Sequence, residues 1–310
     1  MKFFIIGGSG LLGYKIVKLA AERHETFFTY NFRQVSVEGA TAIKMDKCNR
    51  TETFDIIRKV KPDVVIDTAA LHNVDYCETH PEEAWKVNVE GTKNIVDACK
   101  EINAKIIFVS TDYVFDGKKG FYNEEDSPNP LNYYAKTKLE AEKIVKEAGI
   151  PFIVARPSVI YGWNPSETKG LKSSSGKSMN FVIWTLMKLR NKEKIKIVTD
   201  QYSSPTLADN LAEALVTMAL SDKQGVYHTA GKTCLNRYDF ALKIAEIFGM
   251  DRNLITPVTS DVFKQIAKRP KKCCLDVSKA ERDFKIKFLT VDEGLLKMKV
   301  QQREQGNVME

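Results

Sequence analysis

Continuously apolar runs alternate with amphipathic segments along the first half of the chain. The apolar runs predict strands, and apolar residues that recur at helical spacing between them predict helices. The expected strands cover residues 2–6, 26–30, 42–45, 63–67, 105–109 and 152–155. Because strands of a parallel sheet are buried on both faces, such runs joined by helices predict an α/β fold with a doubly wound parallel sheet.

A glycine-rich turn follows the first expected strand and opens the first expected helix. Gly7, Gly10 and Gly13 have the spacing G-x-x-G-x-x-G. Gly7 permits the tight turn, Gly10 lets a pyrophosphate approach the backbone, and Gly13 lets the helix pack on the strand. Free N–H groups at the start of the helix would face the phosphates. A glycine turn can precede any helix, but the order strand, turn, helix at the start of the chain favours dinucleotide binding by a Rossmann sheet.

The end of the second expected strand indicates which dinucleotide binds. An NAD site usually has an acidic residue here, which holds the ribose 2′-hydroxyl. This chain has Tyr30-Asn31-Phe32-Arg33 instead, and Arg33 could pair with a 2′-phosphate. We therefore expect NADPH, with NADH as the alternative; an Arg33 that merely lies on a solvated loop would carry no such preference.

The pattern is less regular beyond residue 157. We expect a helix (179–190), a strand (195–198), a helix capped by Thr206 that ends near Leu220, a last strand of the main sheet (226–229) and a helical remainder. Residues 166–178, rich in Gly, Ser and Lys, predict a loop. The expected organisation is a dinucleotide-binding Rossmann domain of residues 1–157 plus 204–232, and a smaller, mainly helical C-terminal substrate-binding lobe of residues 158–203 plus 233–310.

Composition narrows the class of protein. The 310 residues are 43% hydrophobic and 28% charged, so a packed core is expected. The net charge of +7 comes from basic residues spread along the chain, which indicates a solvated basic surface rather than nucleic-acid binding. No stretch approaches the roughly 20 apolar residues of a membrane span, and the first apolar run meets Gly7 too early for a signal peptide. We expect a cytoplasmic protein without nucleic-acid or membrane partners.

Cysteines and histidines give no sign of a metal site. The six cysteines have no C-x-x-C spacing, which predicts reduced, mostly structural thiols; they are Cys48, Cys77, Cys99, Cys234, Cys273 and Cys274. The four histidines are scattered along the chain, so we expect no metal.

Tyr134 and Lys138 are candidates for acid–base chemistry. Four residues apart on a helix, their side chains lie on the same face. A nearby ammonium group favours phenolate and so lowers the pKa of a tyrosine. Such a pair also occurs by chance on solvated helices, but Ser110-Thr111 ends the buried strand upstream, at the sheet edge where ligands bind. Tyr133 stands five residues from Lys138, which turns it away.

Several strings along the chain carry a resemblance to a known family. They are the glycine turn, Ala69-Ala70 with Val74-Asp75, Asn88-Val89-Glu90-Gly91-Thr92, Ser110-Thr111-Asp112-Tyr113-Val114-Phe115, Pro130-Leu131-Asn132, Asp200-Gln201 with Pro205-Thr206, and Arg269-Pro270. With them the chain resembles the extended short-chain dehydrogenase/reductases, and more narrowly the dTDP-4-dehydrorhamnose reductase family. The resemblance runs nearly from end to end.

The resemblance implies a catalytic triad of Thr111, Tyr134 and Lys138. Tyr134 would give its proton to the carbonyl oxygen at C4 of the sugar while hydride arrives from the nicotinamide. Lys138 would lower the Tyr134 pKa and hold the nicotinamide ribose, and Thr111 would hydrogen-bond the same carbonyl oxygen.

Further contacts are expected on both sides of the reacting atoms. The expected cofactor contacts are Gly7, Ser9, Gly10, Leu11, Leu12, Gly13, Asn31, Arg33, Asp46, Thr68, Ala69, Ala70, Asn88, Tyr134 and Lys138. The expected substrate contacts are His72, Asp75, Phe115 and Arg269. The alternatives are core packing for Phe115 and a surface cation of the basic run 268–272 for Arg269.

The chain departs from the family at several positions. Arg156-Pro157-Ser158-Val159 stands where some members have Arg-Thr-Ser-Trp, whose tryptophan contacts the sugar. The loop 164–178 is longer than in the bacterial enzymes. Lys15 stands where some members have a glutamate that binds magnesium between subunits. The resemblance therefore implies no metal site here.

The function expected from these residues is NADPH-dependent reduction of the C4 ketone of a dTDP-4-keto-6-deoxy sugar, dTDP-4-dehydrorhamnose to dTDP-L-rhamnose, by a monomer or homodimer. A nucleotide-sugar epimerase or dehydratase is one alternative, but dehydratases place an Asp-Glu pair after the catalytic Thr, and here Tyr113 follows Asp112. The other alternative is a non-catalytic, NADP-binding regulatory subunit, because the beta subunit of methionine adenosyltransferase resembles the same family.

Overall fold

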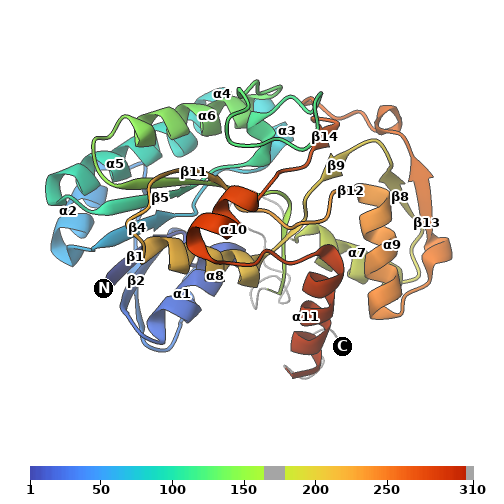
Figure 1. Ribbon diagram of the computed structural model, residues 1–310, viewed down its shortest axis with the longest axis horizontal. Helices are drawn as coiled ribbons and strands as arrows, with labels where there is room; N and C mark the ends of the chain where they lie inside the picture. Colours follow the sequence, from blue (N-terminus) through green and yellow to red (C-terminus); the bar gives the residue numbers. More distant parts are fainter. Residues whose placement is uncertain (164–178, 305–310) are drawn as a thin grey trace.

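The protein is described by a computed structural model that covers residues 1–163 and 179–304. The expected loop at residues 166–178 lies outside the described residues. A layered α/β unit holds the N-terminus, and shorter strands with further helices lie beside it (Figure 1). No helix of the described part is both long and apolar enough to cross a bilayer.

Seven parallel strands of the described chain form the main sheet, in the order β11-β6-β5-β4-β1-β2-β3. Their bounds are β1 (Lys2–Ile6), β2 (Glu25–Tyr30), β3 (Ala40–Lys44), β4 (Val64–Asp67), β5 (Lys105–Val109), β6 (Phe152–Arg156) and β11 (Gly225–His228). The chain runs outward from β1 to β3, returns, and then runs outward from β4 to β11. The order therefore reverses between β1 and β4, and the predicted doubly wound parallel sheet is confirmed.

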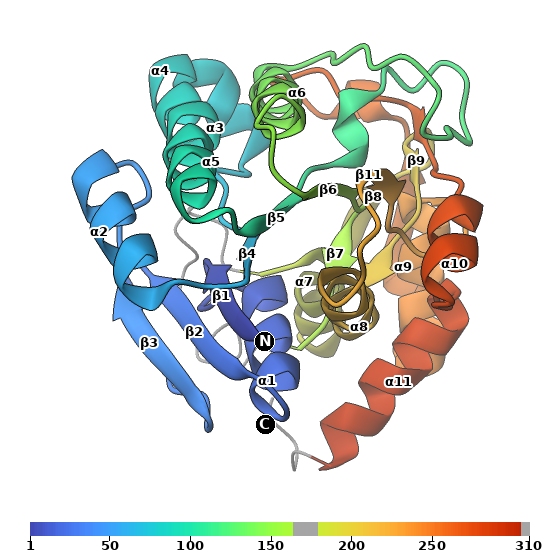
Figure 2. The same ribbon diagram turned by 60° about the vertical axis from the view of Figure 1, so that its left-hand side comes forward.

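Helices cover both faces of the main sheet (Figure 2). One face carries α1 (Leu11–Ala21) and α8 (Ala208–Ala219), and the other carries α2 (Arg50–Val60), α5 (Gly91–Ile102) and α6 (Tyr133–Lys146). Successive side chains of a strand point to opposite faces, so in β1 Phe3 and Ile5 join one core while Phe4 and Ile6 join the other. The sheet is thus buried on both sides, which is why its strands read as continuous apolar runs.

The helix expected between Pro81 and about Glu101 is divided. It consists of α4 (Pro81–Trp85), a π-helical turn (Lys86–Glu90) and α5, and the short α3 (Val74–Thr79) precedes it. A π-helical turn widens the hydrogen-bonded ring by one residue and often marks a functional position. Here it carries Asn88, one of the expected cofactor contacts.

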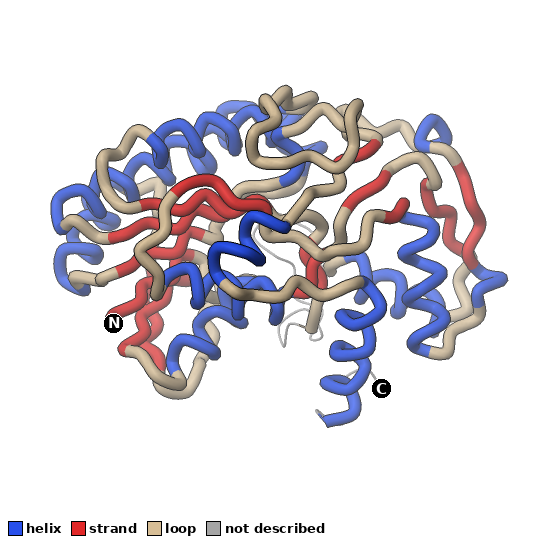
Figure 3. Tube along the Cα trace, viewed as in Figure 1, coloured by secondary structure: helices blue, strands red, loops and turns tan. Residues whose placement is uncertain are grey.

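The remaining strands form small sheets outside the main sheet (Figure 3). The pairs are β7 (Ile160–Tyr161) with β10 (Thr206–Leu207), β8 (Ile195–Val198) with β13 (Ile255–Val258), and β9 (Tyr202–Ser203) with both β12 (Leu235–Asn236) and β14 (Lys272–Cys273). Their helices are α7 (Phe181–Arg190), α9 (Arg237–Phe248), α10 (Ser278–Phe284) and α11 (Val291–Glu304), and 3₁₀ turns occur at Asp112–Val114, Arg252–Leu254 and Ser260–Val262. The expected helical remainder is therefore corrected: short strands interrupt it.

Thr206 does not cap α8. It lies in β10, and its hydroxyl donates to the Ser158 carbonyl at 2.6 Å. Leu207 occupies the N-cap position instead, without a side-chain hydrogen bond. The main-sheet strands all fall within residues 1–157 and 204–232, while the division into two domains stays a prediction.

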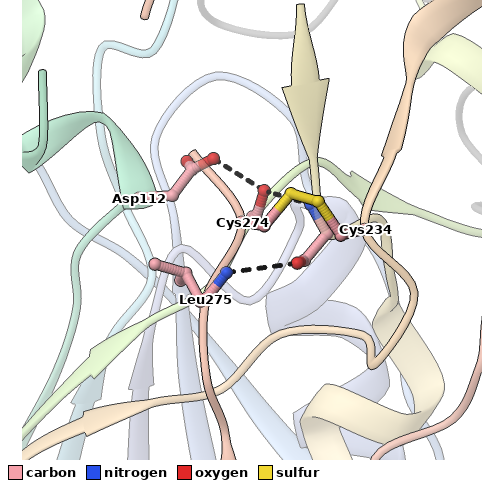
Figure 4. Close-up of a disulfide and its surroundings, with 6 residues drawn as sticks. Asp112, Cys234, Cys274 and Leu275 are labelled. Atoms are coloured by element: carbon pink, nitrogen blue, oxygen red, sulfur yellow. Dashed lines mark hydrogen bonds between the residues drawn. A yellow bond between two sulfur atoms is a disulfide. The ribbon is translucent and has the colours of Figure 1, made fainter. Parts of the chain in front are cut away.

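Cys234 and Cys274 form a disulfide, with Cα atoms 5.5 Å apart across 40 residues of sequence (Figure 4). The prediction that all cysteines are reduced is therefore wrong for this pair. Cys234 precedes β12 and Cys274 follows β14, and both strands pair with β9, which brings the two sulfurs together. The remaining four cysteines are thiols.

Candidate active site

The reversal point between β1 and β4 brings together two segments expected to bind the cofactor. Gly7 has a φ of +82°, and a Cβ on it would lie 3.0 Å from Thr68 Oγ1 and 3.1 Å from the Ala69 Cβ. The Thr68 hydroxyl donates to the Ile6 carbonyl at 2.8 Å. The glycine turn (Gly7–Gly13) and residues 68–70 therefore lie side by side, and Gly7 is required both by its φ and by this close approach.

The start of α1 fits a diphosphate. A Cβ on Gly13 would lie 2.2 Å from the Gly7 carbonyl oxygen, so only glycine lets α1 begin directly on the turn. Gly10 is exposed and forms the N-cap, which has neither a capping side chain nor an acidic residue in the first helical turn. Leu11 and Leu12 then start the helix, whose unsatisfied N–H groups and positive dipole end suit an anion.

Arg33 lies over the glycine turn. Its Nη2 donates to the Ser9 carbonyl oxygen at 2.8 Å. Asn31, at the end of β2, and Asp46, after β3, are both exposed; Asp46 Oδ1 accepts the Cys48 N–H at 2.9 Å. A cation held above the turn, where β2 ends without a carboxylate, fits a ribose that carries a 2′-phosphate.

A buried ion pair that we did not predict supports the segment after β4. Lys47 Nζ lies 3.1 Å from Asp67 Oδ2, and the two side chains are 6% and 0% exposed. The ammonium also donates to the Ala69 carbonyl oxygen at 2.6 Å, and the Thr92 hydroxyl donates to Asp67 at 3.2 Å. Because both charges are paired and hydrogen-bonded, the pair can hold the Ala69 backbone in place. The only sequence signal was an aspartate that ends an otherwise apolar strand.

Asn88 connects the segment after β4 to helix α6. Its side-chain oxygen accepts the Leu71 N–H at 2.8 Å, and its Nδ2 donates to the Leu71 carbonyl at 3.1 Å and to Thr137 Oγ1 at 3.0 Å. The Thr137 hydroxyl in turn donates to the Tyr134 carbonyl at 2.7 Å. Asn88 is buried, so in this structure it positions the helix that carries Tyr134, and its contact with a cofactor stays a prediction.

Thr111 directly follows β5, and Tyr134 and Lys138 lie four residues apart on α6. The Thr111 side chain lies close enough to Tyr134 to lower its pKa. Helix α6 is aligned by Asn132, which sequence reasoning did not single out for this role. Its Oδ1 accepts the Ala135 N–H at 3.0 Å as the N-cap, and its Nδ2 donates to the Lys268 carbonyl at 2.9 Å. An Asn before a predicted helix is a recognisable cap signal.

Burial controls the proton affinities of Tyr134 and Lys138. Tyr134 is 9% exposed and Lys138 2% exposed. Burial raises the pKa of Tyr134, although the Thr111 side chain lowers it. Burial, helped by the charge of Lys47, lowers the pKa of Lys138 to about 7. The pKa of Tyr134 is therefore raised on balance because desolvation dominates it, and the lowering by Lys138 stays a prediction.

A second buried ion pair lies one helical turn beyond Lys138. Glu142 and Arg156 form a two-point contact, with Nε–Oε1 at 2.9 Å and Nη2–Oε2 at 2.6 Å, and the Ser110 hydroxyl donates to Glu142 at 2.6 Å. Glu142 raises the pKa of Lys138, and the Lys138 ammonium lies 3.9 Å from the Phe108 ring centroid. These contacts hold α6 to β5 and β6 beneath the catalytic residues.

The four expected substrate contacts occupy different positions. Arg269 forms a two-point ion pair with Asp75, at 3.0 Å and 2.8 Å, so these two residues join α3 to the segment after β13. His72 is exposed at the same edge of the sheet. Phe115 is fully buried and stacks on Tyr122 with centroids 4.2 Å apart. Phe115 is thus a core residue here, as its alternative interpretation had it.

Two charged residues near the catalytic cluster were not singled out from the sequence. Asp112 is 3% exposed, directly after Thr111, and burial raises its pKa to about 6. Arg237, at the start of α9, lowers the pKa of Asp112 and of Tyr113 through its charge. An Asp after a strand and an Arg at the start of a helix are both common, so the sequence alone does not identify these two as residues of the site.

Lys15, which stands where some family members have a magnesium-binding glutamate, forms an ion pair. Lys15 Nζ lies 2.9 Å from Asp209 Oδ1, which joins α1 to α8. Among residues 1–163 and 179–304, no group of three or more His, Cys, Asp or Glu side chains could hold a metal ion.

Comparison with known proteins shows the family of this chain. The RmlD substrate binding domain matches residues 1–303. A dTDP-4-dehydrorhamnose reductase of Aggregatibacter actinomycetemcomitans is 31% identical, over 92% of this chain and 94% of its own. The methionine adenosyltransferase 2 subunit beta of Bos taurus is also 31% identical, over 90% of this chain and 81% of its own. The crystal structure of the Bacillus anthracis dTDP-4-dehydrorhamnose reductase in complex with NADP has a TM-score of 0.82 at 25% identity, and the alignment covers 97% of this chain and 99% of that one.

The match to the family therefore covers nearly the whole chain, and it includes both the glycine turn and the Tyr134–Lys138 helix. The chain belongs to the RmlD substrate binding domain family, that is, to the extended short-chain dehydrogenase/reductases that resemble dTDP-4-dehydrorhamnose reductase.

Proposed function

We propose that this protein is an NADPH-dependent reductase of the C4 ketone of a dTDP-4-keto-6-deoxy sugar, converting dTDP-4-dehydrorhamnose to dTDP-L-rhamnose. The observation that carries the proposal is the placement of Thr111, directly after β5, close enough to Tyr134 of α6 to affect its pKa. Helix α6 also carries Lys138, and the sheet edge concerned is the one that bears the glycine turn. The reductase relative and the NADP complex of a family member support it.

The cofactor-facing residues have defined tasks in this proposal. The open start of α1 and the backbone of the glycine turn bind the pyrophosphate. Arg33 pairs with the 2′-phosphate, which favours NADPH over NADH. NADPH, when bound, supplies the hydride.

The catalytic residues act on the ketone oxygen. Tyr134 donates its phenolic proton to this oxygen as negative charge develops there, and Thr111 hydrogen-bonds the same oxygen and orients it. Lys138 supplies a cation that favours the phenolate left behind. Because its pKa is about 7, the ammonium is only partly populated near neutral pH, so its protonated fraction should affect the rate.

The test is NADPH oxidation, followed by absorbance, with dTDP-4-dehydrorhamnose as substrate. Wild-type turnover that is lost in Tyr134→Phe, with NADPH affinity retained, supports the reductase. Absence of turnover in the wild type, despite tight NADPH binding, contradicts it.

A second function is favoured by the similarity to a methionine adenosyltransferase beta subunit. In that case the chain would bind NADP and regulate a partner enzyme instead of reducing a sugar. The discriminating measurement is titration of a methionine adenosyltransferase catalytic subunit with this chain, by calorimetry and by its activity. Binding without any sugar reduction supports the regulatory function.

A further inference from the structure

Asp112 is a buried carboxyl group whose two oxygens face different hydroxyl groups. Its Oδ1 lies 3.1 Å from Thr111 Oγ1, and its Oδ2 lies 2.6 Å from Ser158 Oγ. The residue is 3% exposed, so these hydroxyl groups take the place of water. A carboxyl in this position can influence the hydroxyl of the expected catalytic threonine without touching the substrate.

Hydrogen bonds behind Asp112 determine which of its oxygens can carry a proton. Ser158 Oγ accepts the Ser204 N–H at 3.2 Å, and the Ser158 hydroxyl donates to Asp112 Oδ2. Ser204 Oγ accepts the Leu275 N–H at 3.3 Å, directly after the disulfide (Figure 4). While Asp112 Oδ2 accepts from Ser158, a proton on the carboxyl lies on Oδ1, facing Thr111.

The Thr111 hydroxyl has one proton and two lone pairs. One lone pair accepts the Tyr113 N–H at 3.2 Å. When Asp112 is a carboxylate, it attracts the Thr111 proton. When Asp112 is a carboxylic acid, it donates to the second lone pair of Thr111, and the Thr111 proton turns to the side of Tyr134.

We propose that Asp112 is a positioning residue, which in its acid form turns the Thr111 hydroxyl proton towards the ketone oxygen being reduced. This inference rests on the proposed reductase function and deepens it. The acid form also removes a negative charge that raises the Tyr134 pKa, so it makes Tyr134 a better proton donor as well.

Charged and titratable groups from several elements face Asp112. They are Tyr134 of α6, Arg237 of α9, Cys273 of β14 and the neighbouring Tyr113. Burial raises the pKa of Asp112 to about 6, while the hydrogen bonds from Ser158 and Thr111 and the charge of Arg237 lower it. Both forms of the carboxyl are therefore populated within the ordinary range of pH.

The first test is the pH dependence of kcat for ketone reduction. Above its pKa the acid fraction falls about tenfold per pH unit, so wild-type kcat should fall roughly tenfold to hundredfold between about pH 6 and about pH 8, with KM unchanged. In Asp112→Asn the amide oxygen can accept from Ser158 while its NH2 group donates to Thr111 at every pH. This variant should keep a high kcat at about pH 6 and lose the part of the fall that Asp112 causes, so that only the shallower fall from deprotonation of Lys138 remains.

Two further variants test whether the fall in kcat moves along the pH scale in the expected direction. Ser158→Ala removes a hydrogen bond that lowers the Asp112 pKa, so the fall in kcat should move to higher pH. Asp116→Asn is the matched control, because Asp116 accepts from the Tyr122 hydroxyl at 2.7 Å and does not face Thr111; it should keep the wild-type profile. An unchanged profile in Asp112→Asn, or a uniform loss of kcat at all pH values, overturns the proposal.

A readout without turnover separates this inference from the proposed function. Folded Asp112 holds its proton up to about pH 6, so its own contribution to stability should fall as pH rises from about 4 to about 6. The difference in unfolding midpoint between wild type and Asp112→Asn should therefore change over this pH range. Thr111→Val should show coupling to Asp112→Asn in a double-mutant cycle at about pH 5. If the wild type has no ketone reductase activity, the proposed function is contradicted. If this coupling is absent, the inference about Asp112 is overturned.

Discussion

The glycine turn is built from neighbouring residues of the chain, whereas the catalytic cluster of Thr111, Tyr134 and Lys138 depends on residues as distant as Leu275. In the turn, backbone groups and an open helix end provide the binding chemistry, and a missing Cβ is the main requirement. In the cluster, side chains provide the chemistry, and each is oriented by other buried side chains. The binding groups of the turn lie within a few residues of one another, while the side chains of the cluster are oriented by segments that are distant in sequence.

A buried ion pair supports each of the two regions. Lys47–Asp67 supports the cofactor side through the Ala69 carbonyl, and Arg156–Glu142 supports the catalytic side through Ser110. Both pairs lie close enough to Lys138 to affect its pKa through Lys47, Asp67 and Glu142. Lys138 is therefore where the two halves of the site meet electrostatically.

The largest expected effect comes from Tyr134→Phe. Removing the proton donor should lower kcat about a thousandfold, within the range for general acid catalysis, and should leave the NADPH dissociation constant within about twofold of wild type because the glycine turn is untouched. Steady-state kinetics and fluorescence titration measure the two quantities. Tyr133→Phe is the control, and a similar loss in that variant would contradict the assignment.

A large effect on stability is expected from Cys234→Ser combined with Cys274→Ser. The disulfide closes a loop across 40 residues, and such cross-links contribute about 3–4 kcal/mol to the free energy of unfolding. Denaturant unfolding with and without reductant measures the loss of unfolding free energy. Because the disulfide adjoins the Leu275 contact with Ser204, kcat should fall more than NADPH affinity. The control is Cys48→Ser, which should match wild type; equal losses of kcat and affinity would contradict the separation of the two halves.

A pair of glycine substitutions distinguishes packing from binding within the turn. A Cβ at Gly13 would lie 2.2 Å from the Gly7 carbonyl, so Gly13→Ala should lower the free energy of unfolding by about 2 kcal/mol and weaken NADPH binding with it. At Gly10 the nearest atom is 3.3 Å away, so Gly10→Ala should weaken NADPH binding with less loss of stability. Thermal unfolding and NADPH titration of both variants make the comparison, which fails if the two lose equal stability.

The smallest expected effect is on cofactor preference. Arg33→Gln should weaken NADPH binding roughly tenfold, the effect of one charge-assisted hydrogen bond, and should leave NADH binding nearly unchanged. Parallel titrations with both dinucleotides measure the ratio. An equal loss for NADH would mean that Arg33 acts only by holding the Ser9 carbonyl.

Local patterns in the chain were sufficient to predict the fold class, the glycine turn and the Tyr134–Lys138 pair. Strand periodicity and glycine spacing depend on residues close in sequence, because a strand or a helix is formed from consecutive residues. The same reasoning failed for the part after residue 230, where β12 and β14 have two residues each and are too short to produce a pattern.

The sequence by itself determined the doubly wound sheet, the position of the dinucleotide turn and the identity of the expected catalytic residues. Only the tertiary structure decided that Cys234 meets Cys274, that Lys47 pairs with Asp67, that Phe115 belongs to the core, and that burial, not Lys138, dominates the pKa of Tyr134. The physical reason is that desolvation and pairing depend on which distant segments pack together. That packing follows from the whole chain and leaves no local signal in it.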